Sequence, residues 1–194
     1  GRAIGYAHSR GVLHRDVTSR NIMVTKDGNV VVVDFGLAVV QGTTRFTQTG
    51  ATVGTLAYMA PELFTTGKAT EASDVYGLGV VLYEMVTGRV PYRESYEAAL
   101  MWAIVNRDAD APSAGVPGLD PRVDQILARV LAKDPAARHK SAEQLLGELE
   151  ALLQTGVLPD VAPDRALVRT PPPAFTPTPT PHPRRKRMLA GVAI

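Results

Sequence analysis

The sequence contains no cysteine among its 194 residues. This absence excludes disulfide bonds and zinc sites built on cysteine, and it is typical of a protein from a reducing compartment. The one long apolar stretch with helical character, residues 73–87, is too short to cross a bilayer, which takes about 20 residues. The apolar content of 45% is ordinary for a globular protein, so the chain has enough apolar residues for one domain with a core.

The chain also has little net charge, only +2. Four of its positive charges are consecutive, at residues 184–187. The remainder holds 17 Lys and Arg against 19 Asp and Glu, so it is mildly acidic. This balance gives no indication of a nucleic-acid partner.

Two short β-branched runs, residues 22–24 and 30–33, flank the polar stretch 26–29. Asp-Gly between apolar runs predicts a β-hairpin. If Asp27 and Gly28 form the turn, the strands pair Val24 with Val31, Ile22 with Val33, and Asn21 with Asp34.

This register predicts an oxygen-rich site at the open end of the hairpin. The Asn21 amide oxygen and the Asp34 carboxylate would lie together there, and such ligands suit Mg²⁺ when phosphate and water complete its shell. Asp16, five residues before Asn21, supplies a third oxygen side chain that could accept a proton from an incoming hydroxyl.

The motifs His14-Arg15-Asp16, followed by Asn21, and Asp34-Phe35-Gly36 resemble the catalytic loop and the metal motif of the eukaryotic-type protein kinases. The resemblance implies that Asp16 is the catalytic base and that Asn21 and Asp34 bind Mg²⁺ or Mn²⁺ together with ATP. It gives His14 and Arg15 structural roles.

Residues 36–60 are rich in Thr and Gly and lack a lasting apolar period, so we expect a surface loop. The run from Gly54 to Glu62 is similar to the end of the activation segment in the serine/threonine branch of the family. The resemblance implies that Thr55 contacts the protein substrate and that Thr47 and Thr49 are phosphorylated, which would place negative charge near Arg15. The alternative is that threonines simply suit an exposed loop.

Residues 73–87 predict a helix that is apolar all round and therefore buried, with Ser73 as its N-cap and Gly88 as its stop. The kinase resemblance implies that Asp74 braces the catalytic loop and that Arg138 pairs with Glu62. Further helices are expected to end at Gly11 and to cover residues 95–107, 121–133 and 141–153, the last with an apolar stripe of five leucines, 145, 146, 149, 152 and 153. The fold class expected is mainly α, the large lobe of an α+β kinase, with a short hairpin that carries the motifs.

The kinase resemblance predicts three regions. Residues 1–156 would be the C-terminal lobe of a kinase domain, without the Gly-rich loop and strand lysine that the family places earlier. Residues 157–187 would be a disordered linker, because seven prolines fall within residues 170–183 and a basic cluster follows. Residues 188–194 are apolar and would begin a transmembrane segment, as in bacterial receptor-like kinases with a cytoplasmic kinase domain and a single span. A solvated basic tail or a nucleic-acid patch are the alternatives.

The sequence departs from the serine/threonine pattern at Thr18, where the family usually has a lysine that reaches the transferred phosphate. Arg20 stands where tyrosine kinases carry an arginine, so it could supply the missing cation. The function expected is phosphorylation of Ser and Thr on protein substrates, with autophosphorylation in a homodimer. The alternatives are a pseudokinase or docking module, and a helical domain whose motifs arise by chance.

Overall fold

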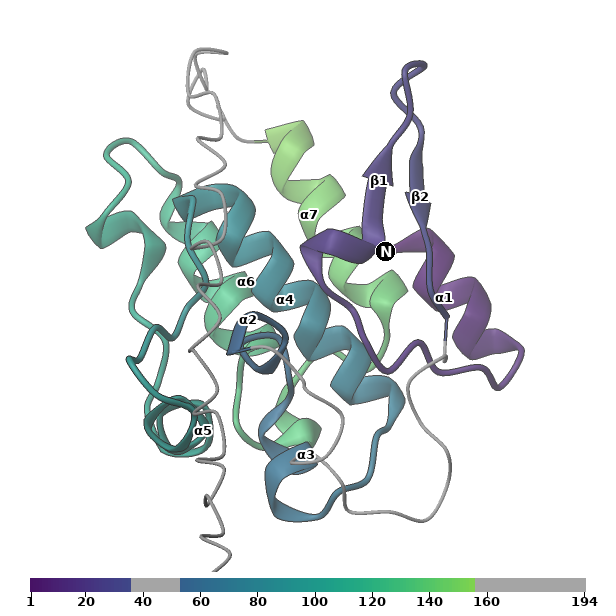
Figure 1. The fold of residues 1–194 in the computed structure, drawn as a ribbon. Helices are drawn as coiled ribbons and strands as arrows, with labels where there is room; N and C mark the ends of the chain where they lie inside the picture. Colours follow the sequence, from purple (N-terminus) through teal and green to yellow (C-terminus); the bar gives the residue numbers. More distant parts are fainter. Residues whose placement is uncertain (36–52, 156–194) are drawn as a thin grey trace, which may run out of the picture. The chain divides into compact units, whose positions relative to one another are not determined.

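The computed structural model describes residues 1–35 and 53–155. This part is mainly helical, with one two-stranded antiparallel sheet, which confirms the expected fold class (Figure 1). The predictions for Gly36, Thr47, Thr49, the proline-rich and basic stretch and the apolar C-terminal run lie outside the described residues. The elements in chain order are α1 (Arg2–Ser9), η1 (Ser19–Asn21), β1 (Ile22–Val24), β2 (Val30–Val32), α2 (Val53–Leu56), α3 (Pro61–Thr65), α4 (Glu71–Thr87), α5 (Glu97–Asn106), η2 (Pro112–Ala114), α6 (Pro121–Val130), η3 (Pro135–Ala137) and α7 (Ala142–Thr155).

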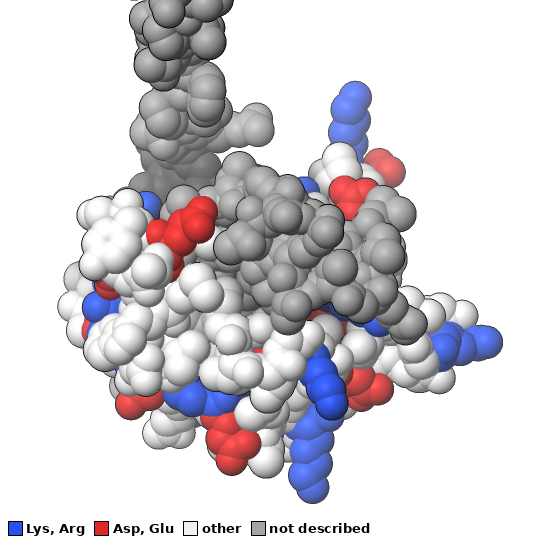
Figure 2. Space-filling view, turned by 60° about the horizontal axis from the view of Figure 1, so that its bottom comes forward, with Lys and Arg blue, Asp and Glu red and all other residues white. Residues whose placement is uncertain are grey.

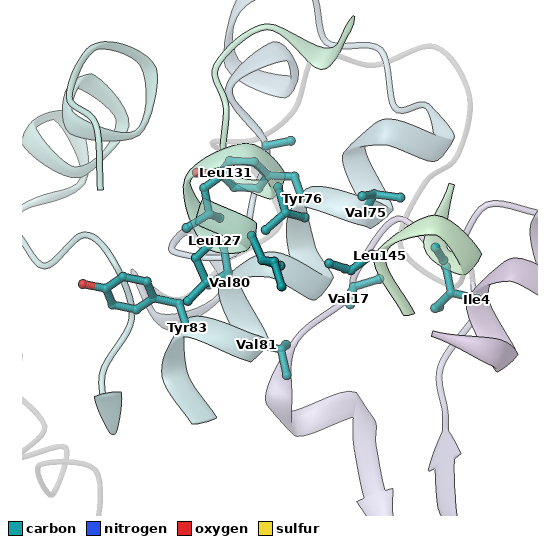
Figure 3. Packing of buried hydrophobic residues seen from close by; sticks show 14 of the residues in the cluster. Ile4, Val17, Val75, Tyr76, Val80, Val81, Tyr83, Leu127, Leu131 and Leu145 are labelled. Carbon is teal, nitrogen blue, oxygen red and sulfur yellow. The ribbon is translucent and has the colours of Figure 1, made fainter. Parts of the chain in front are cut away.

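Helix α4 lies at the centre of the hydrophobic core. Its residues Val75, Tyr76 and Val80 have no exposed surface, as predicted for a helix that is apolar all round. They belong to one cluster with Leu127 of α6 and Leu145 of α7 (Figure 3). Val17, directly after Asp16, belongs to the same cluster, so the catalytic loop packs on this core.

The start of α4 differs from the prediction. Thr70, not Ser73, is the N-cap, and Ser73 is the third helical residue, whose Oγ accepts a hydrogen bond from the Thr70 backbone N–H at 3.0 Å. The two residues form a reciprocal capping box. The prediction was wrong because the apolar periodicity begins only at Val75, after a polar first turn. The predicted end at Gly88 is confirmed, whereas α1 ends at Ser9 with Arg10 as its C-cap, and Gly11 follows with a φ of 70°.

Gly79 of α4 lies close to the C-terminal end of α6. A Cβ at this position would lie 2.5 Å from Val130 Cγ1 and 3.2 Å from Leu131 Cδ2. We therefore expect Gly79→Ala to lower the free energy of unfolding by about 1–3 kcal/mol through overpacking, as measured by urea denaturation of the full chain. Gly147→Ala on α7 is the matched control, because nothing lies within 4 Å of its Cβ, and it should stabilise by about 0.5–1 kcal/mol. A Gly79→Ala variant as stable as the wild type would contradict this packing.

The hairpin is present, but the predicted register was wrong by one residue. Ile22 pairs with Val32, Met23 with Val31 and Val24 with Val30. A two-residue turn of the favoured kind needs positive φ at both central residues, whereas only Gly28 has it, at 78°. The loop is one residue longer: the Gly28 N–H donates to Thr25 O, and the Thr25 N–H donates to Asn29 O. Asn21 consequently lies opposite Val33, whose N–H it accepts at 2.9 Å, and Asp34 lies one residue further along.

The end of the predicted surface loop is also different from the expectation. Residues 53–56 form the short helix α2, and Leu56, Ala57 and Ala60 are buried. Leu56 and Ala57 pack with α5 in a second apolar cluster. The prediction was wrong here because it rested on the high Thr and Gly content of residues 36–60, although this stretch ends in apolar residues that are buried.

The remaining helices match the predictions to within a few residues. Asp120 caps α6, since its side chain accepts the Arg122 N–H. In α7, Leu145 and Leu152 are buried, but Leu153, expected in the core stripe, is exposed. Across residues 1–35 and 53–155 no helix has the length and apolar character required to span a membrane.

Candidate active site

Asp74, in the first turn of α4, fixes the backbone of the catalytic loop. Its Oδ2 accepts the His14 N–H at 2.7 Å, and its Oδ1 accepts the Arg15 N–H at 2.8 Å. Oδ2 also hydrogen-bonds to His8 Nε2 at 2.8 Å. The carboxylate is buried, so these bonds are shielded from water and satisfy a charge that would otherwise be costly.

Two site residues have strained backbones, and one of them, Arg15, is on the loop that Asp74 supports. Arg15 has φ 68° and Asp34 has φ 61°, in the left-handed region that non-glycine residues rarely adopt. Such conformations cost on the order of 1–3 kcal/mol and persist where surrounding contacts impose them. Arg15 directly precedes Asp16, and Asp34 is itself one of the residues expected to bind the metal at the phosphate.

Asp16 and Asn21 are brought together as the sequence predicts. The Asn21 Nδ2 donates to the Asp16 carbonyl oxygen at 2.8 Å and to Asp16 Oδ2 at 3.0 Å. This arrangement orients the Asp16 carboxylate, and it uses the nitrogen end of the Asn21 amide. Asn21 Oδ1 makes no hydrogen bond within the described residues and is free to serve as a ligand.

His14 joins the catalytic loop to the end of the hairpin. Its Nε2 is 3.0 Å from Val33 O, its Nδ1 accepts the Asp16 N–H at 3.3 Å, and its ring lies against Phe35 with centroids 4.5 Å apart. The buried imidazole thus holds Asp34, which lies between Val33 and Phe35, beside the loop that carries Asp16 and Asn21.

Thr18 and Arg20 have different surroundings. Thr18 is only 4% exposed, whereas Arg20 is exposed. A buried hydroxyl cannot reach a phosphate in solvent, while an exposed guanidinium can. Of the two side chains, only that of Arg20 is therefore accessible to a phosphate, and it carries a positive charge. The catalytic roles of both residues stay predictions.

Sequence reasoning missed a hydrogen-bonded chain beside this site. Ser19 Oγ is 2.8 Å from Tyr58 Oη, and Tyr58 Oη donates to Glu84 Oε2 at 2.5 Å. Burial and the hydrogen bond to Glu84 raise the pKa of Tyr58 to about 12, so the phenol stays protonated and keeps donating. These two hydrogen bonds connect Ser19, the neighbour of Arg20, to Glu84 of α4. No local pattern signals it, because its partners are 39 and 26 residues apart.

Thr55, expected to contact the substrate, is half-buried and lines a small pocket that Asp16 and Tyr58 also line. Thr55 and the candidate base Asp16 therefore line the same pocket. His8, which supports Asp74, was the other residue that the sequence did not single out for the site.

The structure pairs Glu62 with Arg138 through two bonds, from Nη1 to Oε1 at 2.9 Å and from Nη2 to Oε2 at 2.7 Å. The Arg138 side chain is fully buried, and it also donates to three backbone carbonyls, those of Ala132, Ala72 and Lys133. Burial alone would raise the pKa of the Glu62 carboxyl, but hydrogen bonds from Arg138, its own backbone and Ser73 outweigh burial and hold that pKa below its ordinary value.

The donor set of the site fits a hard divalent cation bound together with phosphate. Asn21 and the exposed Asp34 offer only oxygen, which is what Mg²⁺ prefers. Within the described residues no group of three or more His, Cys, Asp or Glu forms a self-sufficient metal site. Phosphate and water would therefore have to complete the coordination shell.

Comparison with known proteins agrees with this geometry. Residues 1–148 match the protein kinase domain family. The chain is 39% identical over 156 residues to serine/threonine-protein kinase PknL of Mycobacterium tuberculosis, covering 79% of this chain and 39% of PknL. It is 39% identical over 185 residues to serine/threonine-protein kinase PknE of the same organism, covering 94% of this chain and 32% of PknE.

A probable serine/threonine-protein kinase of Streptomyces coelicolor is 36% identical over 154 residues, covering 78% of this chain and 23% of that protein. The chain thus spans well under half the length of these relatives. Kinases of this family use ATP and a divalent metal in general. The family match, and relatives that are named serine/threonine-protein kinases, confirm the resemblance read from the motifs: this chain belongs to the protein kinase family and is similar to its bacterial serine/threonine members.

Proposed function

We propose that the protein containing this chain transfers the γ-phosphate of ATP to Ser and Thr hydroxyls of protein substrates. The observation that carries the proposal is the Asp16–Asn21 pair, hydrogen-bonded at 2.8 and 3.0 Å on a loop whose backbone Asp74 fixes. The three oxygen groups of the family motifs, at Asp16, Asn21 and Asp34, are all present.

Each residue then has a defined role. Asp16 accepts the proton of the attacking hydroxyl, and the hydrogen bond from Asn21 keeps its carboxylate oriented toward that hydroxyl. Asn21 Oδ1 and the Asp34 carboxylate would hold Mg²⁺. When bound, Mg²⁺ neutralises the phosphate charge that develops during transfer. Arg20 supplies a further positive charge at the transferred group.

The exposed hairpin supports the expectation that more of the kinase domain packs on this part. Met23, Val24, Val30 and Val31 are 44–70% exposed, and they occupy both faces of the hairpin, which projects from the helices in Figure 1. Apolar side chains on both faces are typical of a strand pair that another element covers. We propose that the nucleotide-binding part of the domain covers it.

The surface charge supports protein partners rather than nucleic acid. On the face drawn in Figure 2, Lys and Arg lie among Asp and Glu, without one continuous basic patch over the described residues of that face.

We further propose a cytoplasmic kinase domain on a single-pass membrane protein, and autophosphorylation in a homodimer. Fractionation of the full-length protein into membrane and soluble pools tests the first of these, and the dependence of the autophosphorylation rate on protein concentration tests the second.

Phosphotransfer by the full-length protein tests the proposed activity. With ATP labelled at the γ-phosphate and a general protein substrate, we expect label on phosphoserine and phosphothreonine, and loss of labelling when EDTA removes the metal. Absence of transfer, with retained binding of a protein partner, would instead support the docking-module alternative. Label on phosphotyrosine alone would contradict the substrate class.

The different surroundings of Arg20 and Thr18 give a paired prediction. Arg20→Ala should lower the turnover number of the full-length enzyme by on the order of 10-fold to 100-fold, because it removes a cation from the phosphate. Thr18→Ala should have a much smaller effect on turnover, since Thr18 is buried. Steady-state kinetics on both variants provide the measurement, and equal losses would refute the assignment of Arg20.

A further inference from the structure

His8, in the last turn of α1, is a buried histidine whose side chain makes one hydrogen bond within the described residues. Its Nε2 lies 2.8 Å from Asp74 Oδ2, and the two side chains are only 5% and 2% exposed. Its Nδ1 is also buried and has no hydrogen-bond partner in the part of the chain that the structure describes. The polar contacts of this imidazole are therefore directed at Asp74 alone.

The Asp74 carboxylate receives three hydrogen bonds from the described residues, and His8 donates the one that comes from outside the catalytic loop. A carboxylate only accepts, so the hydrogen of this bond is on Nε2 whatever the charge of the ring. The other two donors are the backbone N–H groups of His14, which shares Oδ2 with His8, and of Arg15, which donates to Oδ1. Without His8, the loop and the carboxylate would hold only each other.

His8 can act as a fixed reference because α1 is held in the core. Ile4 has no exposed surface and belongs to the main apolar cluster together with residues of α4. Ala7, next to His8, is buried as well. The backbone beyond His8 is also fixed, since the Val12 N–H donates to Ala7 O at 3.0 Å. The Nε2–H group thus has a defined position relative to the first turn of α4.

We propose that His8 is a positioning residue for phosphotransfer, because its Nε2–H fixes the rotation of the Asp74 carboxylate. The plane of the carboxylate sets the direction of the His14 and Arg15 N–H groups, and these residues directly precede Asp16. This role rests on the proposed function, since it concerns the same site. It gives His8 no contact with substrate or metal.

The strained backbone of Arg15 explains why the His8 bond affects turnover. Arg15 has φ 68°, and such a conformation persists only while the surrounding contacts impose it. When the carboxylate rotates, the Arg15 N–H loses its acceptor and φ can relax. Because Asp16 follows directly, this relaxation displaces the candidate base from the attacking hydroxyl. A misplacement of about 1 Å can lower turnover by on the order of 100-fold.

The test compares His8→Phe with His8→Gln in the full-length protein, at a temperature at which both variants are folded. Phenylalanine keeps a ring but has no donor, whereas the amide nitrogen of glutamine can take the place of Nε2 and donate. His8→Phe should lower the turnover number by about tenfold, less than the limit above because the two loop donors remain, with little change in the KM for ATP. His8→Gln should recover most of this loss.

Hydrogen exchange gives a second readout, which does not require activity. In His8→Phe the His14 and Arg15 amides should exchange about tenfold faster than in the wild type, measured relative to the amides of α6. The comparison with α6 separates local opening of the loop from a general loss of stability. In His8→Gln the two amides should exchange at nearly the wild-type rate.

His139→Phe is the matched control. His139 is 1% exposed, its Nε2 lies 2.9 Å from Glu148 Oε2, and its Nδ1 likewise lacks a partner among the described residues. This variant removes an equivalent bond that does not involve the catalytic loop, so its turnover number should stay close to that of the wild type.

Equal losses of turnover in His8→Phe and His139→Phe would overturn the role of His8, and so would unchanged exchange at the His14 and Arg15 amides. If the wild type transferred no phosphate, the proposed function would fail instead. The exchange rates would then still decide whether His8 holds the loop.

Discussion

Asp16→Asn is expected to lower phosphotransfer by the full-length protein by on the order of 10²–10⁴-fold. The substitution keeps the size of the side chain, and its Oδ1 can still accept the bond that Asn21 Nδ2 now gives to the carboxylate. The loop should therefore hold its shape, while the side chain can no longer take the proton of the attacking hydroxyl. The turnover number should fall, and the KM for ATP should change little.

Asp27→Asn is the control for this experiment. Asp27 lies in the exposed turn between β1 and β2, so its substitution removes one carboxylate without touching the site. We expect its turnover number to stay within about twofold of the wild type, as for most surface substitutions. If Asp16→Asn behaved like Asp27→Asn, the role of Asp16 as base would be wrong.

The largest expected loss of stability comes from Arg138→Met. The fully buried guanidinium makes two bonds to Glu62 and three to backbone carbonyls, and it lies 4.9 Å from the centre of the Tyr76 ring. Methionine fills part of the volume but removes the Arg138 donor from the Glu62 carboxylate and from those carbonyls. Breaking a buried pair in this way costs about 3–5 kcal/mol of the free energy of unfolding, which urea denaturation measures.

Arg122→Met is the matched control, because it breaks the Arg122–Asp120 pair on the surface, where solvent screens the charges. Its effect on urea denaturation should be much smaller. Similar losses for the two arginine variants would show that burial of the Glu62–Arg138 pair does not matter.

The same pair predicts the response to acid. Because the pKa of Glu62 is held below its ordinary value of 4.5 in the folded chain, its contribution to stability is fully present above that pH. It is lost as the pH falls below 4.5 and through the lower pKa of the folded state. In Arg138→Met the main hydrogen-bond donor is gone and burial remains, so the variant should lose less stability over this range. An unchanged acid dependence would contradict the assignment.

Much of this fold could be predicted because the signals are local. The apolar residues of α4, the Asp120 cap and the Asp-Gly turn each lie within a few residues of the structure they determine. The hairpin register was wrong because the choice between a two- and a three-residue loop depends on the φ of single residues, which composition does not reveal.

The candidate site was predictable only in part, for a related reason. Asp16 and Asn21 are five residues apart, and the motif predicts that they lie near one another, but it does not predict the hydrogen bond between their side chains. The bonds of Asp74 to His8 and of Tyr58 to Glu84 join residues 66 and 26 positions apart, and only the folded chain brings these together. The burial of Thr18 likewise follows from the packing of the catalytic loop on α4, where Gly77 lets Val17 approach closely.

The central claim is that Asn21 and Asp34 hold one metal ion at the nucleotide phosphates. The most direct measurement is the Mg²⁺ concentration that gives half-maximal phosphotransfer in the full-length protein and in Asn21→Ala, Asp34→Asn and the double variant. We predict that each single variant raises this concentration at least about tenfold. The fold-increase in the double variant should be smaller than the product of the two single fold-increases, because the residues share one ion. An unchanged Mg²⁺ requirement in either single variant, or fully independent effects, would contradict the account.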